Sequence, residues 1–224
     1  MLTKYLQPTY EKSLNQRFRE KRFLFFKNLL QSLPSDRTIQ ILDIGGTASY
    51  WTRMNFINND RIHITLLNLY KVDTDNKNFT SVVGDACCVS QFSDGQFDVV
   101  FSNSVIEHLF TKENQKKMAE EVRRVGKNYY VQTPNYYFPI EPHWLFPFFQ
   151  FFPFSIKVAM TKNFNLGNYP KAPDREMAIK RVNEVKLLTQ GEMKDLFPDG
   201  QVYQEKFLGL TKSITMYHFI QNFS

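Results

Sequence analysis

A loop after the first predicted strand carries the residues best suited to ligand binding. Asp43 ends the apolar run, and Gly45, Gly46 and Thr47 follow it. Glycines let the backbone turn sharply and let a ligand approach the main chain, and exposed N–H groups at the next helix favour a carboxylate or phosphate. A buried carboxylate at Asp43 suits a cationic group such as an ammonium. The alternative is that Asp43 only caps the helix and the glycines only form a turn.

In an open parallel sheet the ligand lies outside the carboxyl ends of the strands, at the point where the strand order reverses. The loop after the first predicted strand is therefore the one that matters most for ligand binding.

A histidine beyond the fifth strand is the preferred general base. His143 lies in a loop expected to overhang the bound ligand, and Glu141 is placed to orient it. The alternative is that both residues only pin an irregular loop. His108 is a second catalytic candidate, and Asn135, Tyr136 and Trp144 are candidates for substrate binding. The four histidines show no metal-ligand spacing, so no metal is expected.

These residues need a layered scaffold to position them, and the hydrophobic pattern supplies one. Apolar runs alternate with helical segments, which indicates right-handed crossovers and a parallel sheet covered on both faces. The sequence therefore predicts a doubly wound, mostly parallel, seven-stranded α/β sheet. Strands are expected at 39–44, 62–69, 79–83, 97–102, 128–132, 201–207 and 213–220, the last two as an antiparallel edge, and helices at 10–33, 49–57, 112–125, 174–185 and 190–196.

Composition restricts the function classes. The 224 residues predict one domain, 1–224, with an N-terminal helical segment, 1–33. Adjacent Cys87 and Cys88 exclude a disulfide scaffold, and the N-terminus has no signal-peptide core, so a cytoplasmic protein is expected. A net charge of +6 is too mild to indicate nucleic acid. The one basic excess, between Lys12 and Lys27, is interpreted as a solvated helix face or as a surface for an anionic lipid or phosphate.

An aromatic-rich insertion, 135–175, follows the fifth strand. Its segment 136–154 holds ten aromatic residues, with Glu141 as its one formal charge. Four prolines in that segment argue against a membrane span, since each removes a backbone donor. The insertion is interpreted as a lid over an apolar substrate, as packing or homodimer surface, or as a peripheral membrane contact.

These motifs together resemble the class I S-adenosylmethionine-dependent methyltransferases of the small-molecule type, over roughly residues 33–132. The Ile-Leu-Asp-Ile-Gly-Gly stretch is similar to the family's cofactor loop, so the resemblance places Asp43, Gly45 and Gly46 around the methionine moiety. It places the segment with Asp85 and Ala86 by the adenine amino group, and Asn103 and Ser104, at the end of the fourth strand, along the cofactor. Asn68 and Leu69, at the end of the second strand, lie where the family binds the ribose hydroxyls. It implies S-adenosylmethionine as cofactor and methyl transfer to a small-molecule oxygen or nitrogen acceptor.

The chain departs from the family pattern at two places. Thr47 and Ser49 stand where further glycines are usual, and Asn68 replaces the acidic residue that binds both ribose hydroxyls. An amide oxygen still accepts one hydroxyl, without the strength that a charge adds. Two alternatives therefore remain, a cofactor-binding protein without turnover and a nucleotide-dependent enzyme on a similar sheet, although the glycine pattern does not fit the second.

Overall fold

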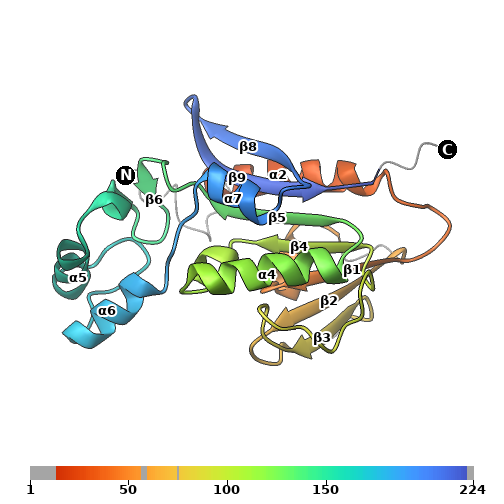
Figure 1. Ribbon diagram of the computed structural model, residues 1–224, viewed down its shortest axis with the longest axis horizontal. Helices are drawn as coiled ribbons and strands as arrows, with labels where there is room; N and C mark the ends of the chain where they lie inside the picture. The colour runs from red at the N-terminus through yellow and green to blue at the C-terminus, as the bar shows by residue number, and fades with distance from the viewer. Residues whose placement is uncertain (1–13, 57–59, 75, 221–224) are drawn as a thin grey trace.

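The computed structural model describes residues 14–56, 60–74 and 76–220. Its centre is a seven-stranded sheet in the order β3-β2-β1-β4-β5-β9-β8 (Figure 1). Five neighbouring strands run parallel, and β9 and β8 continue the sheet antiparallel. The strands are β1 (Ile39–Ile44), β2 (Ile62–Asn68), β3 (Phe79–Val83), β4 (Val99–Asn103), β5 (Tyr129–Pro134), β8 (Gln201–Phe207) and β9 (Leu210–His218). The predicted fold class is confirmed.

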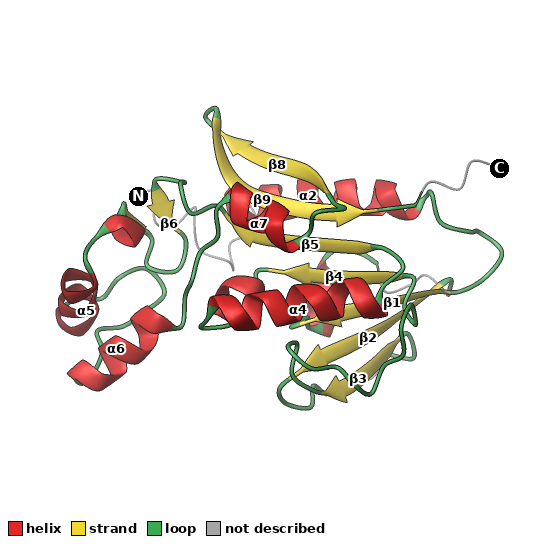
Figure 2. Cartoon of the chain, viewed as in Figure 1, coloured by secondary structure: helices red, strands yellow, loops and turns green. Residues whose placement is uncertain are grey.

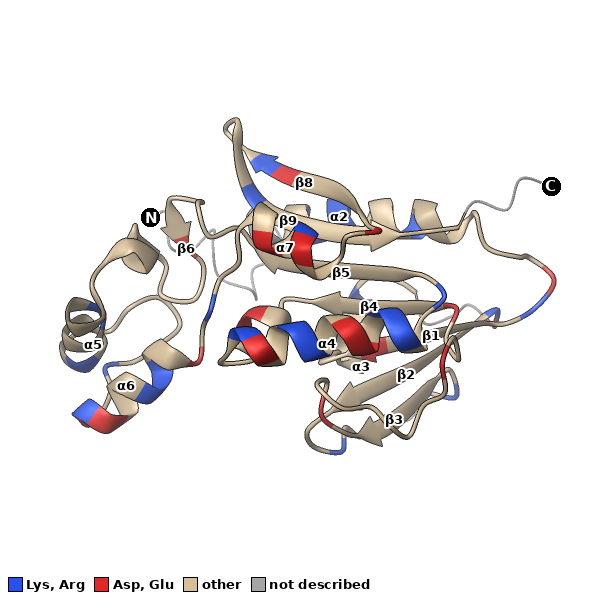
Figure 3. Ribbon diagram, viewed as in Figure 1, with Lys and Arg blue, Asp and Glu red and all other residues tan. Residues whose placement is uncertain are grey.

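Helices cover both faces of this sheet (Figure 2). On one face α4 (Lys112–Val125) and α7 (Gln190–Leu196) bury Met118, Val122 and Met193 against β4, β5 and β9. On the other, α2 (Leu14–Leu30) and α3 (Ala48–Arg53) bury Phe26 and Trp51 against the sheet. The outward face of α4 carries alternating charges, as a solvated helix face should (Figure 3).

The aromatic-rich insertion lies beyond the carboxyl end of β5 (Figure 1). It contains a short hairpin, β6 (Ile140–Glu141) and β7 (Phe146–Pro147), and the helix α5 (Phe154–Asn163). The helix α6 (Arg175–Asn183) begins at its predicted end and packs into the same hydrophobic cluster, so α6 is counted with the insertion from here on. Two 3₁₀ turns, η1 (Ile106–His108) and η2 (Phe149–Phe151), complete the described elements. The insertion has a hydrophobic cluster of its own, in which Trp144 stacks on Phe149 with ring centroids 4.5 Å apart.

Most predicted elements match the structure within two or three residues. Two helices differ: α5 was not predicted because its apolar residues do not gather on one face and so show no helical period, and the expected helix 49–57 ends at Arg53 within the described residues. The predicted start of the first helix, residues 10–13, and Ile57 lie outside the described residues. Among the helices that the structure describes, none is both long and apolar enough to cross a membrane.

Candidate functional site

The carboxyl group of Asp43 lies buried at the end of β1, where it is 1% exposed. Its Oδ2 accepts a 2.7 Å hydrogen bond from Nε1 of Trp51, on α3. The group packs against the backbone of Gly46 so closely that a Cβ atom there would lie 1.6 Å from Oδ2. Burial raises the pKa of Asp43 to about 7, although the hydrogen bond from Trp51 opposes the shift. The buried carboxyl group is thus fixed in a position where it can pair with a cation.

The two glycines of the loop have separate roles. Gly45 has a φ of +73° and packs against Val105 from the turn after β4, so a side chain there would be both strained and obstructed. Gly46 makes room for Asp43, as described above. The Asn68 side chain at the end of β2 then holds the loop, because its Nδ2 donates to the Gly46 carbonyl at 2.9 Å. This leaves the amide oxygen of Asn68 available to a ligand hydroxyl.

A cavity of about 180 Å³ opens at this loop. Asp43, Gly45, Gly46 and Thr47 line one side of it, as predicted, with Asn103 from the end of β4. Arg19 closes the other side from α2, together with Tyr50 and Arg53. The cavity therefore offers a carboxylate and a guanidinium to one ligand, which suits the ammonium and carboxylate of an amino acid.

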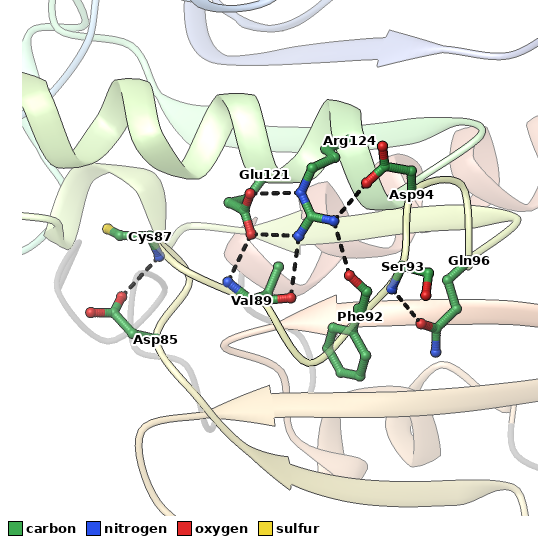
Figure 4. A network of polar contacts seen from close by, with 9 residues as sticks. All are labelled: Asp85, Cys87, Val89, Phe92, Ser93, Asp94, Gln96, Glu121 and Arg124. Carbon is green, nitrogen blue, oxygen red and sulfur yellow. Dashed lines mark hydrogen bonds and ion pairs between the residues drawn. The ribbon is translucent and has the colours of Figure 1, made fainter.

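The predicted adenine-binding residues lie on the loop after β3. Asp85 is exposed, and its Oδ1 accepts a hydrogen bond from the Cys87 N–H (Figure 4). Ala86 packs partly against the core, and Leu69, at the end of β2, is 65% exposed. These positions form an open rim rather than an enclosed pocket.

An arginine on α4 fixes the segment that follows Asp85. The Arg124 guanidinium donates to the carbonyl oxygens of Val89 and Phe92 and to the carboxylates of Glu121 and Asp94 (Figure 4). Glu121 in turn accepts from the Val89 N–H at 2.7 Å. This network ties the loop 85–96 to the helix beside it.

A second cavity, of about 190 Å³, lies next to the first, beyond the ends of β4 and β5. We call it the acceptor cavity. Arg19 lines both cavities. Ser104, which lines the second cavity, follows Asn103, which lines the first. The apolar wall of the acceptor cavity combines α2, the insertion and the β8–β9 hairpin, through Phe18, Phe138, Ile140, Leu145 and Phe207.

Three basic side chains, Arg19, Arg22 and Lys212, line the acceptor cavity, and two of them contact one carboxylate. Arg22, which is 8% exposed, donates to Glu205 at 3.0 Å, and Lys212 Nζ lies 3.8 Å from the same carboxylate. Burial lowers the pKa of Lys212 to about 8, and its ammonium lies 4.0 Å from the centroid of the Phe18 ring. Among the described residues, no ion pair joins a carboxylate to Arg19.

This arrangement corrects one interpretation of the basic N-terminal segment. Arg22 is not part of a solvated face, because it forms a buried ion pair with Glu205 on β8. Lys12 lies outside the described residues. A helical period alone does not reveal this, because the partner of Arg22 comes from the far end of the chain.

The structure brings the three predicted catalytic residues together. Nδ1 of His143 lies 2.6 Å from Oε1 of Glu141, whose other oxygen accepts the backbone N–H groups of His143 and Trp144. Nε2 of His143 lies 3.1 Å from Nε2 of His108, at the end of η1. The pKa of His143 is raised: burial alone would lower it, but the hydrogen bond and charge of Glu141 outweigh burial. Burial, with the charge of His143, lowers the pKa of His108 to about 4.

A fourth titratable residue belongs to the same cluster. Glu107 is fully buried, and its Oε2 accepts a hydrogen bond from Thr133 at 3.0 Å. Its Oε1 is buried and has no hydrogen-bond partner within the part of the chain that the structure describes. The ligand atoms of Glu107, His108 and His143 all lie within 4.8 Å of one another. Sequence spacing did not predict this cluster, because His108 and His143 come from different loops.

The predicted substrate-binding residues have separate surroundings. Asn135 lines the acceptor cavity, and its Nδ2 donates to the Thr211 carbonyl at 2.8 Å. Tyr136 and Trp144 instead line a third cavity, of about 210 Å³, between α4 and the insertion. Trp144 is 2% exposed and its Nε1 donates to Thr161, so it belongs to the core of the insertion.

Two functional candidates, Arg19 and Lys212, were not predicted from the sequence. Each is an ordinary basic residue in its own element, and only the packing of α2 beside the β8–β9 hairpin places both at the acceptor cavity. In the sequence, the basic excess around Arg19 could have indicated it, but that excess was interpreted as a solvated helix face or as a surface for an anionic lipid or phosphate.

Comparisons with known proteins agree with this geometry. Residues 43–129 match a family model described as a methyltransferase domain, a span from the loop aspartate to the start of β5. An uncharacterized protein of Mycobacterium tuberculosis is 39% identical over 57 residues, a match that spans 25% of this chain and 20% of the relative's length.

Solved structures share the fold over most of the chain. A carbon methyltransferase named CurJ has a TM-score of 0.60 at 14% identity, over 97% of this chain and 57% of that chain. A SAM-dependent methyltransferase from Methanosarcina mazei has a TM-score of 0.53 at 16% identity, over 86% and 94% of the two chains. One from Aquifex aeolicus has a TM-score of 0.50 at 12% identity, over 96% and 95%.

Proposed function

We propose that this chain, which carries a class I S-adenosylmethionine-dependent methyltransferase domain, methylates an oxygen or nitrogen atom of a small, partly apolar molecule with a negative charge. The observation that carries the proposal is the pair of adjoining cavities that share Arg19. Methyl transfer from a sulfonium is an in-line displacement, so donor and acceptor must lie in adjoining spaces, with the reacting atoms about 3 Å apart.

The first cavity supplies the groups that a methyl donor of this kind needs. The ammonium of the cofactor pairs with Asp43, and its carboxylate pairs with Arg19 and with N–H groups at the start of α3. The Asn68 oxygen accepts a ribose hydroxyl, and Asp85 accepts from the adenine amino group. Both roles follow from the position of these residues at the ends of β2 and β3.

The acceptor cavity supports a substrate with two different parts. Its aromatic walls favour an apolar body, such as a lipid- or sugar-linked group, at about 25 cal/mol for each Å² buried. The basic side chains of Arg19, Arg22 and Lys212, which line this cavity, favour a carboxylate or phosphate on the same molecule. Glu141, His143 and His108, in the loops beside this cavity, handle the proton that the acceptor atom loses.

The direct test is transfer of a radiolabelled methyl group from S-adenosylmethionine to matched pairs of acceptors. Each pair shares an apolar alcohol or amine and differs in one carboxylate, free in one member and esterified in the other. We expect the free acid to react faster, and Lys212→Met to remove most of that preference. Equal rates for both members would contradict the assigned substrate class. Cofactor binding without transfer to any acceptor would instead favour a binding protein without turnover.

A further inference from the structure

The two histidines of the catalytic cluster meet through the same ring atom. The Nε2 atoms of His108 and His143 lie 3.1 Å apart. His143 uses its other nitrogen, Nδ1, toward Glu141 at 2.6 Å.

With its Nδ1–H given to Glu141, His143 turns the lone pair of Nε2 toward Nε2 of His108. Two imidazole nitrogens at this separation either share one proton or bind one cation between them. Metal-binding histidines have this arrangement, in which the distal N–H is held by a carboxylate or a backbone carbonyl. Two nitrogens bound to one Zn²⁺ at about 2.0–2.1 Å with tetrahedral angles lie about 3.3 Å apart, close to the separation here.

A third ligand atom lies within reach. One carboxylate oxygen of Glu107 belongs to the group of ligand atoms within 4.8 Å of one another, and its Oε1 is buried with no hydrogen-bond partner among the described residues. Thr133 holds the other oxygen, which fixes the direction of the carboxylate. An orphaned buried carboxylate oxygen costs free energy, and a cation would remove that cost.

The charges of the cluster point the same way. Glu107 and Glu141 are 0% and 1% exposed, so two carboxylates are buried beside the histidine pair. Burial raises the pKa of Glu107 to about 7, and a divalent cation at the cluster would favour the ionised form of its carboxyl group. Two imidazoles and one carboxylate are a ligand set typical of Zn²⁺ and related transition metals rather than of Mg²⁺ or Ca²⁺.

We propose that Glu107, His108 and His143 form a binding site for one divalent transition-metal ion of the Zn²⁺ type, with Glu141 as the positioning residue of His143. Such an ion lowers the pKa of a hydroxyl or water bound to its open position. That use, the activation of the acceptor atom, rests on the proposed function; the binding of the ion does not.

The test is a calorimetric titration of Zn²⁺ into the whole chain, with Cys87 and Cys88 replaced by serine because neighbouring thiols bind zinc themselves. We expect one ion per chain. His108→Gln and His143→Gln should each weaken binding at least a hundredfold, and Glu141→Gln tenfold to a hundredfold. His218→Gln, a histidine outside the cluster, is the matched control and should bind as the parent does.

Two further measurements distinguish loss of the metal site from loss of folding. Zn²⁺ should raise the melting temperature of the parent and of His218→Gln, but not of His108→Gln, and circular dichroism should show each variant folded. Co²⁺ should give the absorption bands of a tetrahedral or five-coordinate site in the parent alone. Absence of saturable binding, or unchanged binding in His108→Gln, would overturn the metal site and leave a shared proton. Titration with S-adenosylhomocysteine without metal tests the cofactor site separately, so failure of either proposal is recognisable.

Discussion

At the scale of single residues, Asp43 combines a buried position with a role that requires charge. In the free protein, burial raises its pKa to about 7. Pairing with the cofactor's ammonium requires the ionised form, so binding below pH 7 must release a proton. The cofactor affinity should therefore rise with pH and level off above about pH 7, with binding roughly tenfold weaker at pH 6 than at pH 8. Calorimetry with S-adenosylhomocysteine at pH 6, 7 and 8 measures this, and a constant or falling affinity would contradict it.

The second prediction at this scale concerns His143. The residue contacts Glu141 and His108 but does not line the cofactor cavity. His143→Ala should therefore lower kcat by at least a hundredfold, the usual range for lost proton handling, and leave the dissociation constant of S-adenosylhomocysteine within about threefold of wild type. Steady-state kinetics beside calorimetry separates the two quantities. Equal losses in both would assign His143 to the architecture of the loop.

At the scale of elements, the β8–β9 hairpin is joined to α2 by a buried ion pair. Arg22 and Glu205 have side chains 10% and 3% exposed, and Lys212 shares the carboxylate. Glu205→Ala leaves two buried cations without it and should reduce the free energy of unfolding by about 3 kcal/mol. Asp60→Ala is the control, because its ion pair with Lys77 has side chains 83% and 80% exposed. Urea denaturation measures the free energy of unfolding of both variants. Similar small decreases in the two would show that the buried pair contributes little to stability.

The loop 85–96 provides a second prediction at this scale. Arg124 holds the loop through the carbonyl groups of Val89 and Phe92 without lining the cofactor cavity. Arg124→Gln should loosen the loop, speed amide exchange there, and weaken S-adenosylhomocysteine binding severalfold. Lys116→Gln, on the same helix with an exposed i,i+4 pair, is the matched control. Hydrogen exchange by mass spectrometry reads the loop, and unchanged exchange in Arg124→Gln would show that other contacts hold it.

Sequence patterns predicted elements well where hydrophobic periodicity is local, and poorly where long-range packing decides. The strand at 79–83 and the helices at 112–125 and 190–196 match the structure at both ends, because turns and caps such as Thr189 mark them. The helix α5 was not predicted, because its apolar residues do not gather on one face and give no helical period. The cofactor loop was predictable from adjacent residues, whereas the acceptor cavity was not, because α2, the insertion and β9 each contribute one wall.

At the scale of the whole molecule, the insertion has an inner and an outer set of aromatic residues. Trp144 and Phe149 fill its own core, whereas Tyr137, Phe148 and Phe154 are 65%, 53% and 46% exposed. The insertion also supplies Phe138, Ile140 and Leu145 to the acceptor cavity, which is consistent with the lid interpretation. That the outer set contacts a membrane or a second copy stays a prediction, as does the cytoplasmic location.

Two cavities lie at one edge of the sheet. The loop after β1 and Asn103 line the first, residues beyond the ends of β4 and β5 line the second, and Arg19 of α2 lines both. The proposed function assigns the first cavity to the cofactor and the second to the acceptor, and it depends most on the Asp43 carboxylate, which is proposed to pair with the ammonium of the cofactor.

The most direct test is a calorimetric titration of S-adenosylhomocysteine into the wild type and Asp43→Asn. The substitution keeps the size of the side chain and an oxygen that can accept from Trp51, so the fold should persist. Loss of the charge–charge contact should weaken binding 10- to 100-fold, which corresponds to about 1.5–3 kcal/mol. Asp36→Asn, an exposed aspartate before β1, should bind as the wild type does. Equal affinities for the wild type and Asp43→Asn would contradict the account.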